Sequence, residues 1–467
     1  MATIRPFRSL GYSVPTDRDL SKQIAPPYDV LEKQAKSDLL SQCEHNIVAV
    51  DLPHLPAKTV GPDEVYENAG HAFRQWIDQG VVERRSQPAF FAYRQTFTVS
   101  ADTIAATNVD QSPDRGKSFS RLALMANVAL QPLGRPQQSQ SSGLESELGL
   151  PRGGIYPHEQ TFPDAKLDRL KLMRATKVQL SPIFGLYLDS QAQVNNLLQK
   201  VVGGRSTVHG TTTNDGVLHE LWAIEDTGLI QSFVHIFADK DVYIADGHHR
   251  YTTSLNYLDE LAGESLPENH PARFCMFALV AMEDPGMIVL PTHRVLGGMV
   301  NFSIDRFADK ARSLVEIRPS SSKDLADLAR SLPYHGPHAM GIYTTDKSGS
   351  IIQIVTTVDE DPLAAYFPDK PRVWRQLDVA IVQHLIVEKI CEPNFVPSGR
   401  KIQWQYPHRL DQVKALVDQS DYQLGLILWA QTIESVRQVS KSDQLMPQKS
   451  TFFYPKLATG LVIHSLA

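Results

Sequence analysis

Segments with helical and with strand-like patterns alternate along almost the whole chain, and this alternation restricts the fold more than any other feature. The stretch 63–79 has apolar residues at helical spacing, and 90–99 (FFAYRQTFTV) has the aromatic and β-branched residues typical of a strand. Near the C-terminus, 377–390 again predicts a helix and 422–430 a strand. Interleaved strands and helices predict an α/β (α+β) protein with a composite mixed-sheet core and a smaller C-terminal α/β part.

The length of 467 residues allows two to four domains at roughly 100–200 residues each. One segment lacks any periodicity, because 132–154 is rich in Gln, Ser, Gly and Pro. We therefore predict an N-terminal α/β part of the core at 1–131, a loop or linker at 132–154, a second core part at 155–300, and a C-terminal α/β domain at 301–467.

Charge, cysteine content and hydropathy indicate the compartment of the protein and exclude some classes of partner. The net charge of −6 provides no general attraction for nucleic acid, so a nucleic-acid partner is not expected. Cys43, Cys275 and Cys391 are far apart and have no CxxC spacing, which fits a reducing compartment. The N-terminus lacks the apolar run of a signal peptide, and no apolar stretch approaches about 20 residues. We predict a soluble cytoplasmic protein without a membrane partner.

The densest chemical feature is a predicted strand-to-helix turn at 246–250. Residues 241–245 have the pattern of a strand, Asp246-Gly247 is a turn signal, and apolar residues recur at helical spacing from His248 onward. The unpaired N–H groups at a helix start attract anions, and Arg250 can add a bidentate grip on phosphate or carboxylate. His248 and His249 can donate hydrogen bonds or transfer protons. We predict that this turn, from Asp246 to Arg250, binds an anion such as a phosphate or carboxylate group. A capped helix start with two surface histidines is the alternative.

A second polar cluster precedes the turn in the chain. His158 and Glu159 lie in a predicted loop, and a helix that opens at Pro163-Asp164 carries Lys166 and Arg169 on one face. A glutamate beside a histidine, followed by cations at a helix start, suits a general base next to a phosphate site. We assign Glu159, His158 and His248 as candidate catalytic residues, with Lys166 and Arg169 as further phosphate-binding residues. A solvated helix is the alternative.

Three weaker candidates complete the predicted site. Asp29 ends the stiff segment APPYD, and His293 and Arg294 follow a predicted strand; we assign these three residues to substrate binding. The run 446–457 can supply Lys449 or Lys456 to an anion, although packing of its aromatic residues explains most of it. No metal site is predicted, since the zinc-helix motif requires a second histidine where position 162 is Phe.

With these motifs assembled, the chain resembles the bacterial domain-of-unknown-function family number ten-fifteen. The motifs occur in the family's order and are APPYDV at 25–30, PHEQT at 157–161, YIADGHHR at 243–250, LPTHR at 290–294 and MPQKSTFFYPKL at 446–457. The sequence departs from the family mainly at 100–154. The turn itself is similar to that of the ParB/sulfiredoxin-like superfamily, which includes partition proteins that use CTP, sulfiredoxin and an ADP-dependent serine kinase.

This second resemblance implies that Asp246, Gly247, His248 and Arg250 hold nucleotide phosphates, with ATP, ADP or CTP and Mg²⁺ as cofactors. It also implies an upstream glutamate that activates a substrate hydroxyl, a role we give to Glu159. The first hypothesis is therefore a kinase-like, nucleotide-dependent phosphotransferase acting on a small hydroxyl-bearing metabolite. The alternatives are a non-catalytic protein that binds a nucleotide or phosphometabolite, and a metal-dependent hydrolase or nuclease.

Overall fold

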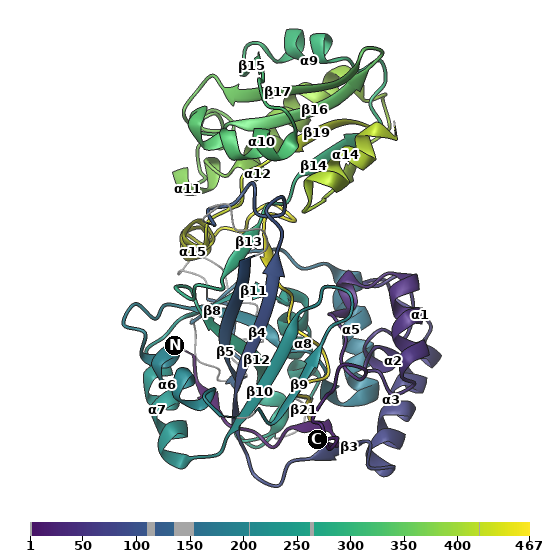
Figure 1. The fold of residues 1–467 in the computed structure, drawn as a ribbon, viewed down its shortest axis with the longest axis vertical. Coiled ribbons are helices and arrows are strands. Elements are labelled where there is room, and N and C mark those ends of the chain that lie inside the picture. The colour runs from purple at the N-terminus through teal and green to yellow at the C-terminus, as the bar shows by residue number, and fades with distance from the viewer. Residues whose placement is uncertain (1, 110–116, 135–153, 205, 262–265, 420) are drawn as a thin grey trace. The chain divides into compact units, whose positions relative to one another are not determined.

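The computed structural model describes residues 2–109, 117–134, 154–204, 206–261, 266–419 and 421–467 (Figure 1). The chain forms two compact units, each made of segments distant in the sequence. Unit 1 comprises Met1–Thr98, Ser118–Met287 and Pro455–Ala467, and unit 2 comprises Val99–Lys117 and Ile288–Tyr454. This division differs from the four predicted parts, because 99–117 joins unit 2 and the C-terminal residues return to unit 1. Most of the predicted linker at 132–154 lies outside the described residues.

Within the described ranges, unit 1 is built on a nine-stranded sheet in the order β6–β11–β8–β12–β5–β4–β10–β9, with β1 paired to β5. The pairs β6–β11 and β8–β12 are parallel, while β8–β11, β5–β12, β4–β10, β9–β10 and β1–β5 are antiparallel. The strands are β1 (Ile4–Arg5), β4 (Phe90–Val99), β5 (Lys117–Ala129), β6 (Ile155–Tyr156), β8 (Ile183–Tyr187), β9 (Val208–Thr211), β10 (Leu218–Ile224), β11 (Val242–Asp246) and β12 (Phe274–Ala281). The predicted mixed α/β class is confirmed.

The central strand β12 shows why this sheet forms. Its sequence FCMFALVA is continuously apolar, and all eight residues are buried. It pairs with β8 on one side and β5 on the other. A strand covered on both faces is expected to be apolar throughout rather than alternating, which matches this run.

Helices cover the sheet in successive layers. Helix α8 (His248–Leu261) packs on β8 and β12, α5 (Pro163–Thr176) packs on α8, and α3 (Asp63–Asp78) packs on α5. Pro163 occupies the first turn of α5, where its missing N–H costs nothing. Unit 1 also contains α1 (Lys33–Gln42), α2 (Val48–Asp51), α6 (Gln193–Val201) and α7 (Thr227–Phe237). The layering brings the starts of α5 and α8 into one region of the unit.

Two short ladders complete unit 1. Strand β2 (Leu10–Tyr12) pairs with β3 (Val82–Arg84), and β7 (Val178–Gln179) pairs with β21 (His464–Ser465). The second ladder pairs the C-terminal end of the chain with a strand of unit 1.

Unit 2 has an antiparallel sheet in the order β15–β17–β16–β19–β14–β18. Its strands are β14 (Arg294–Gly297), β15 (Val315–Pro319), β16 (Met340–Asp346), β17 (Gly349–Thr357), β18 (Gln403–Gln405) and β19 (Tyr422–Ile427), with a separate ladder of β13 (Ile288–Leu290) and β20 (Phe452–Tyr454). Its core joins α10 (Leu325–Ser331) and α14 (Leu410–Asp418) to the sheet. The predicted helix at 377–390 is present as α12 (Asp378–Ile381) followed by a π-helix, Val382–Cys391.

Among the described residues, unit 2 also has the α-helices α9 (Ile304–Ala311), α11 (Arg372–Arg375), α13 (Glu392–Phe395) and α15 (Ile433–Lys441). In the part of the chain that the structure describes, no helix combines the length and apolarity needed to span a bilayer.

Candidate functional site

The candidate site lies in unit 1 at the turn between β11 and α8. Strand β11 ends at Asp246, one residue beyond the predicted strand, and α8 begins at His248, as predicted. Between them Gly247 has φ +96°, a conformation that L side chains rarely adopt. The first helical bond runs from the Tyr251 N–H to the Gly247 carbonyl, at 3.0 Å. The glycine therefore makes the abrupt change from a buried strand to a helix start sterically inexpensive.

Asp246 is held at this turn by two cations. One carboxylate oxygen accepts a hydrogen bond from the Arg250 guanidinium at 2.6 Å, and the other accepts from the Lys456 ammonium at 2.7 Å. Arg250 also donates to the carbonyl of Pro182. Burial alone would raise the pKa of Asp246, but the Lys456 and Arg250 charges outweigh it and hold that pKa well below its usual value. Asp246 is therefore ionised at neutral pH.

A second carboxylate belongs to the same group of charges. Asp29 lies in a short 3₁₀ turn, Tyr28–Val30, and its carboxylate is 3.1 Å from the Lys58 ammonium. Burial and Asp246 tend to raise the pKa of Asp29, but Lys58, with Lys456 and Arg250, lowers it. We call Asp29, Lys58, Asp246, Arg250 and Lys456 the turn cluster. It has three cations and two carboxylates, which leaves one surplus positive charge beside the start of α8.

The two histidines of the turn fasten the 157–162 loop to it. The Nε2 atom of His248 accepts a hydrogen bond from the His158 backbone N–H at 3.2 Å. The Nε2 atom of His249 accepts from the Phe162 N–H at 3.0 Å, and its ring stacks on the Phe162 ring. The His158 ring is bonded through Nδ1 to the Ile244 carbonyl at 2.8 Å. The loop is thus attached at both ends to β11 and α8.

These contacts determine the protonation of the histidines. Because Nε2 of His248 accepts an N–H, the neutral ring carries its proton on Nδ1. Burial above all lowers the pKa of His248 well below its ordinary value, with contributions from the neighbouring positive charges. Burial also lowers the pKa of His158, although Glu159 opposes the shift. Both rings are neutral at pH 7, and Nε2 of His248 is occupied, so His248 holds the loop in place.

Glu159 lies between the two fastened ends of this loop and is half-buried. Within the described ranges, no hydrogen bond or ion pair engages its carboxylate. The ring nitrogens of His158 and His248 accept or donate hydrogen bonds within the protein, whereas no described hydrogen bond engages the Glu159 carboxylate. The catalytic roles of Glu159, His158 and His248 stay predictions.

The predicted phosphate-binding residues of α5 have different surroundings. The Arg169 guanidinium bonds to the Asp168 carboxylate at 2.8 Å and to Asp51 through its carbonyl at 2.6 Å and its carboxylate at 3.4 Å. It also lies 3.9 Å over the Tyr28 ring. We call Arg169, Asp51 and Asp168 the Arg169 cluster. Arg169 is thus engaged by protein carboxylates, whereas Lys166, in the first turn of α5, is half-buried and has no described ion pair.

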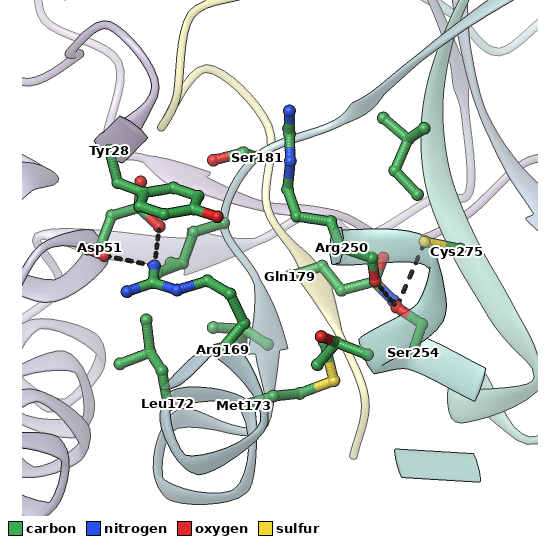
Figure 2. Close-up of a pocket in the computed structure, with 14 residues that line it drawn as sticks. Tyr28, Asp51, Arg169, Leu172, Met173, Gln179, Ser181, Arg250, Ser254 and Cys275 are labelled. Carbon is green, nitrogen blue, oxygen red and sulfur yellow. Dashed lines mark hydrogen bonds and ion pairs between the residues drawn. The ribbon is translucent and has the colours of Figure 1, made fainter. Parts of the chain in front are cut away.

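A narrow pocket of about 40 Å³ lies between Arg169 and Arg250 (Figure 2). Figure 2 shows Arg169 reaching Asp51 beside the Tyr28 ring, while Gln179, Ser254 and Cys275 form a hydrogen-bonded group across the pocket. This volume holds about one water molecule, so the pocket itself has no room for a metabolite. It places the Arg169 cluster and the turn cluster on two sides of one small space.

The predicted substrate-binding residues divide between the units. Asp29 belongs to the turn cluster in unit 1, whereas His293 and Arg294 lie in unit 2, with His293 between β13 and β14 and Arg294 at the start of β14. Nδ1 of His293 accepts from the Leu428 N–H at 3.1 Å, and burial lowers the pKa of His293 to about 3. Arg294 donates to the Thr292 carbonyl at 2.8 Å. The roles given to His293 and Arg294 stay predictions.

Sequence reasoning did not find Lys58 and named Lys456 only as one of two lysines that the run 446–457 can supply to an anion. Lys58 lies in an irregular loop with φ +66° and has no motif around it. Lys456 had a weak signal, because it follows Pro455 in the run 446–457, yet its partner Asp246 is 210 positions away. Among the described residues, no group of three or more His, Cys, Asp or Glu side chains is arranged to hold a metal ion.

Comparison with solved structures gives distant matches. A glutamate-to-glutamine mutant of a free serine kinase in complex with AMP is 13% identical, with a TM-score of 0.32, over 64% of this chain and 84% of that chain. A conserved hypothetical protein from Pyrococcus furiosus is 13% identical, with a TM-score of 0.30, over 65% and 89%. SbnI from Staphylococcus aureus, truncated at its C-terminus, is 12% identical, with a TM-score of 0.28, over 64% and 79%. Identities and scores this low say nothing about chemistry.

Comparison with protein families gives a direct result. We found no match among curated proteins. The model of the family described as "Protein of unknown function (DUF1015)" matches residues 4–112 and 139–380, well over half of the chain. These ranges contain the APPYDV, PHEQT, YIADGHHR and LPTHR motifs. The chain therefore belongs to the DUF1015 family of proteins of unknown function.

Proposed function

We propose that the chain is a nucleotide-dependent, kinase-like phosphotransferase that acts on a small hydroxyl-bearing metabolite. The observation that carries the proposal is the pair of hydrogen bonds by which His248 and His249 hold the 157–162 loop. These bonds attach the backbone before and after Glu159 to the start of α8. A base next to an anion-binding helix start is the arrangement that phosphoryl transfer requires.

Each part of the turn has a role in this proposal. The backbone N–H groups at the start of α8 and the Arg250 guanidinium bind the nucleotide phosphates, because helix starts and guanidinium groups both favour anions. Gly247 allows the phosphates to approach the backbone closely. Glu159 accepts the proton of the substrate hydroxyl. His158, His248 and His249 fix the position of the base relative to the phosphate site.

Nucleotides usually bring Mg²⁺, which would neutralise charge on the transferred phosphoryl group. The turn cluster does not fit a directly bound Mg²⁺. Both oxygens of Asp246 already accept hydrogen bonds from cations, and Asp29 pairs with Lys58. Within the protein, Arg250 and its neighbouring cations therefore neutralise the charge of the phosphates.

Two substitutions test the proposal. Calorimetric titration with ADP, ATP and CTP is expected to detect nucleotide binding by the wild type and none by Arg250→Ala. Glu159→Gln is expected to keep the affinity but to slow turnover by about 10²–10⁴-fold across a panel of hydroxyl metabolites, the usual contribution of a general base. Asp164→Asn, an exposed carboxylate change in the first turn of α5, serves as the matched control and is expected to leave binding and turnover unchanged.

Three outcomes would change this interpretation. Nucleotide binding that survives Arg250→Ala would contradict the phosphate role of the turn. Full turnover in Glu159→Gln would remove the general base from the mechanism. Binding without consumption of nucleotide for any metabolite would favour the alternative, a non-catalytic protein that binds a nucleotide or phosphometabolite.

A further inference from the structure

The C-terminal segment of unit 1 delivers a lysine to the phosphate-binding turn. Lys456 follows Pro455, and its ammonium reaches Asp246 at 2.7 Å. Its side chain is largely buried, at 13% exposure. A flexible, strongly hydrated side chain is costly to order and bury. Something in the unit must therefore fix its backbone in place.

Two residues on one face of β4 hold that backbone. Tyr93 and Gln95 are two positions apart, so they point to the same side of the strand, and both are almost fully buried. Gln95 donates from Nε2 to the Lys456 carbonyl at 2.8 Å. The hydroxyl oxygen of Tyr93 accepts from the Ala458 N–H at 3.4 Å. The main chain that directly follows the Lys456 side chain is thus attached to the sheet.

Arg121, on the neighbouring strand β5, reinforces this attachment. It is 1% exposed, and its guanidinium donates to the Pro455 carbonyl at 2.6 Å. It also donates to Oε1 of Gln95, at 3.2 Å from Nε, and lies 4.6 Å over the Phe184 ring. Because Arg121 can only donate and the Lys456 carbonyl can only accept, the orientation of the Gln95 amide between them is fixed. Burying a guanidinium is costly, and two of its bonds here secure the residues around Lys456.

We propose that Lys456 is a phosphate-binding residue of the turn and that Gln95 and Arg121 are positioning residues that hold it there. This inference rests on the proposed function, because the phosphate is that of the proposed nucleotide. Asp246 keeps Lys456 and Arg250 on its two oxygens, so both cations are ordered before the ligand arrives. A terminal or bridging phosphate group then accepts hydrogen bonds from both. The competing interpretation is that Lys456 only neutralises Asp246.

Affinity for inorganic pyrophosphate, ADP and ATP, measured by calorimetry, distinguishes the two interpretations. Lys456→Met is expected to weaken binding by at least about tenfold, since a charge-assisted hydrogen bond is lost. Lys456→Arg restores most of the affinity because it keeps the charge. Lys171→Met is the matched control: it removes another paired lysine of unit 1, 2.6 Å from Asp63, and should leave the affinity unchanged.

Gln95→Glu tests the positioning role and keeps a partner for the Arg121 guanidinium. The new carboxylate gains an ion pair with Arg121 but can no longer donate to the Lys456 carbonyl. We expect an unchanged or higher melting temperature together with weaker pyrophosphate binding. Acetylation of Lys456 by an amine-reactive reagent such as acetic anhydride, followed by mass spectrometry, should become faster in the variant. In the wild type, bound pyrophosphate should protect Lys456 from acetylation.

The outcomes separate this inference from the proposed function. Wild-type protein that binds no phosphate compound would overturn both. Phosphate binding that depends on Arg250 but is equal in Lys456→Met would overturn this inference alone. Gln95→Glu with unchanged Lys456 reactivity and unchanged affinity would overturn the positioning role.

Discussion

The turn cluster and the Arg169 cluster are both buried ionic groups in unit 1, yet their charges balance differently. In the Arg169 cluster, one guanidinium contacts two carboxylates, and Asp168 also binds the Tyr66 hydroxyl at 2.8 Å. In the turn cluster, three cations share two carboxylates. A cation that faces more than one carboxylate is already neutralised by protein groups. Where cations outnumber carboxylates, the remaining positive charge can attract an anionic ligand. The balance of partners, more than the presence of an arginine, identifies a binding site.

The pKa directions follow the same division. Although burial alone would lower it, Tyr28 and the carboxylates of Asp168 and Asp51 raise the pKa of Arg169. Burial raises the pKa of Asp51, because the charges of Arg169 and Arg250 do not compensate for the lost water. Burial is outweighed at Asp246, where two cations lie within 2.7 Å. Asp246 is therefore the better stabilised carboxylate.

The largest expected effect comes from removing the outnumbered cation. Arg169→Met leaves two buried carboxylates without their guanidinium and should cost about 3–5 kcal/mol of unfolding free energy. Arg250→Met should cost about 1–3 kcal/mol, because Lys456 still pairs with Asp246. The buried thiols of Cys275 in β12 and Cys391 in unit 2 report the two units separately when thiol labelling is followed in urea.

In that experiment, both variants should shift the labelling of Cys275 and leave that of Cys391 nearly unchanged. Equal costs for the two arginines would show that the charge balance does not distinguish the clusters. A shift at Cys391 alone would contradict the assignment of both clusters to unit 1.

These two clusters also show which features of the site can be predicted from the sequence. The strand, the Asp-Gly turn and the α8 helix were predictable because their signals are local: turn chemistry at 246–247 and apolar residues at helical spacing. The fate of Arg169 was not predictable, since its position on a helix face does not reveal that Asp51, from a different helix, is beside it. Lys58 has no motif at all. Local spacing predicts elements, but ion partners depend on packing between distant segments.

The two clusters should contribute to the pH dependence of the unfolding free energy in opposite directions. The folded-state pKa of Asp246 is lowered, so its stabilisation is present above the ordinary Asp pKa of about 3.9 and is lost as the pH falls through the lowered value. Asp246→Asn should therefore lose about 1–3 kcal/mol at neutral pH and flatten the acid limb of the stability curve.

Asp51→Asn is the matched comparison for this titration. Its folded-state pKa is raised, so the ionised carboxylate costs stability that grows as the pH rises above about 3.9. The amide should remove that cost, which makes the pH dependence change in the opposite direction. Urea midpoints measured by circular dichroism between pH 3 and pH 7 give both curves. Parallel curves for the two variants would contradict the assigned pKa directions.

The smallest expected effect concerns the backbone that supports the turn cluster. Gly247→Ala forces a side chain into φ +96° and places its Cβ 3.1 Å from the Arg250 guanidinium, which should cost about 1 kcal/mol. Gly80→Ala is the matched control, because Gly80 also has positive φ, +72°, but no atom lies within 4 Å of its added Cβ. Gly247→Ala should lose somewhat more stability than Gly80→Ala, because its methyl group also pushes the Arg250 guanidinium away from Asp246. Only Gly247→Ala should also weaken pyrophosphate binding, since the displaced guanidinium leaves Asp246 and the phosphate site together; equal binding in both variants would place the ligand away from this turn.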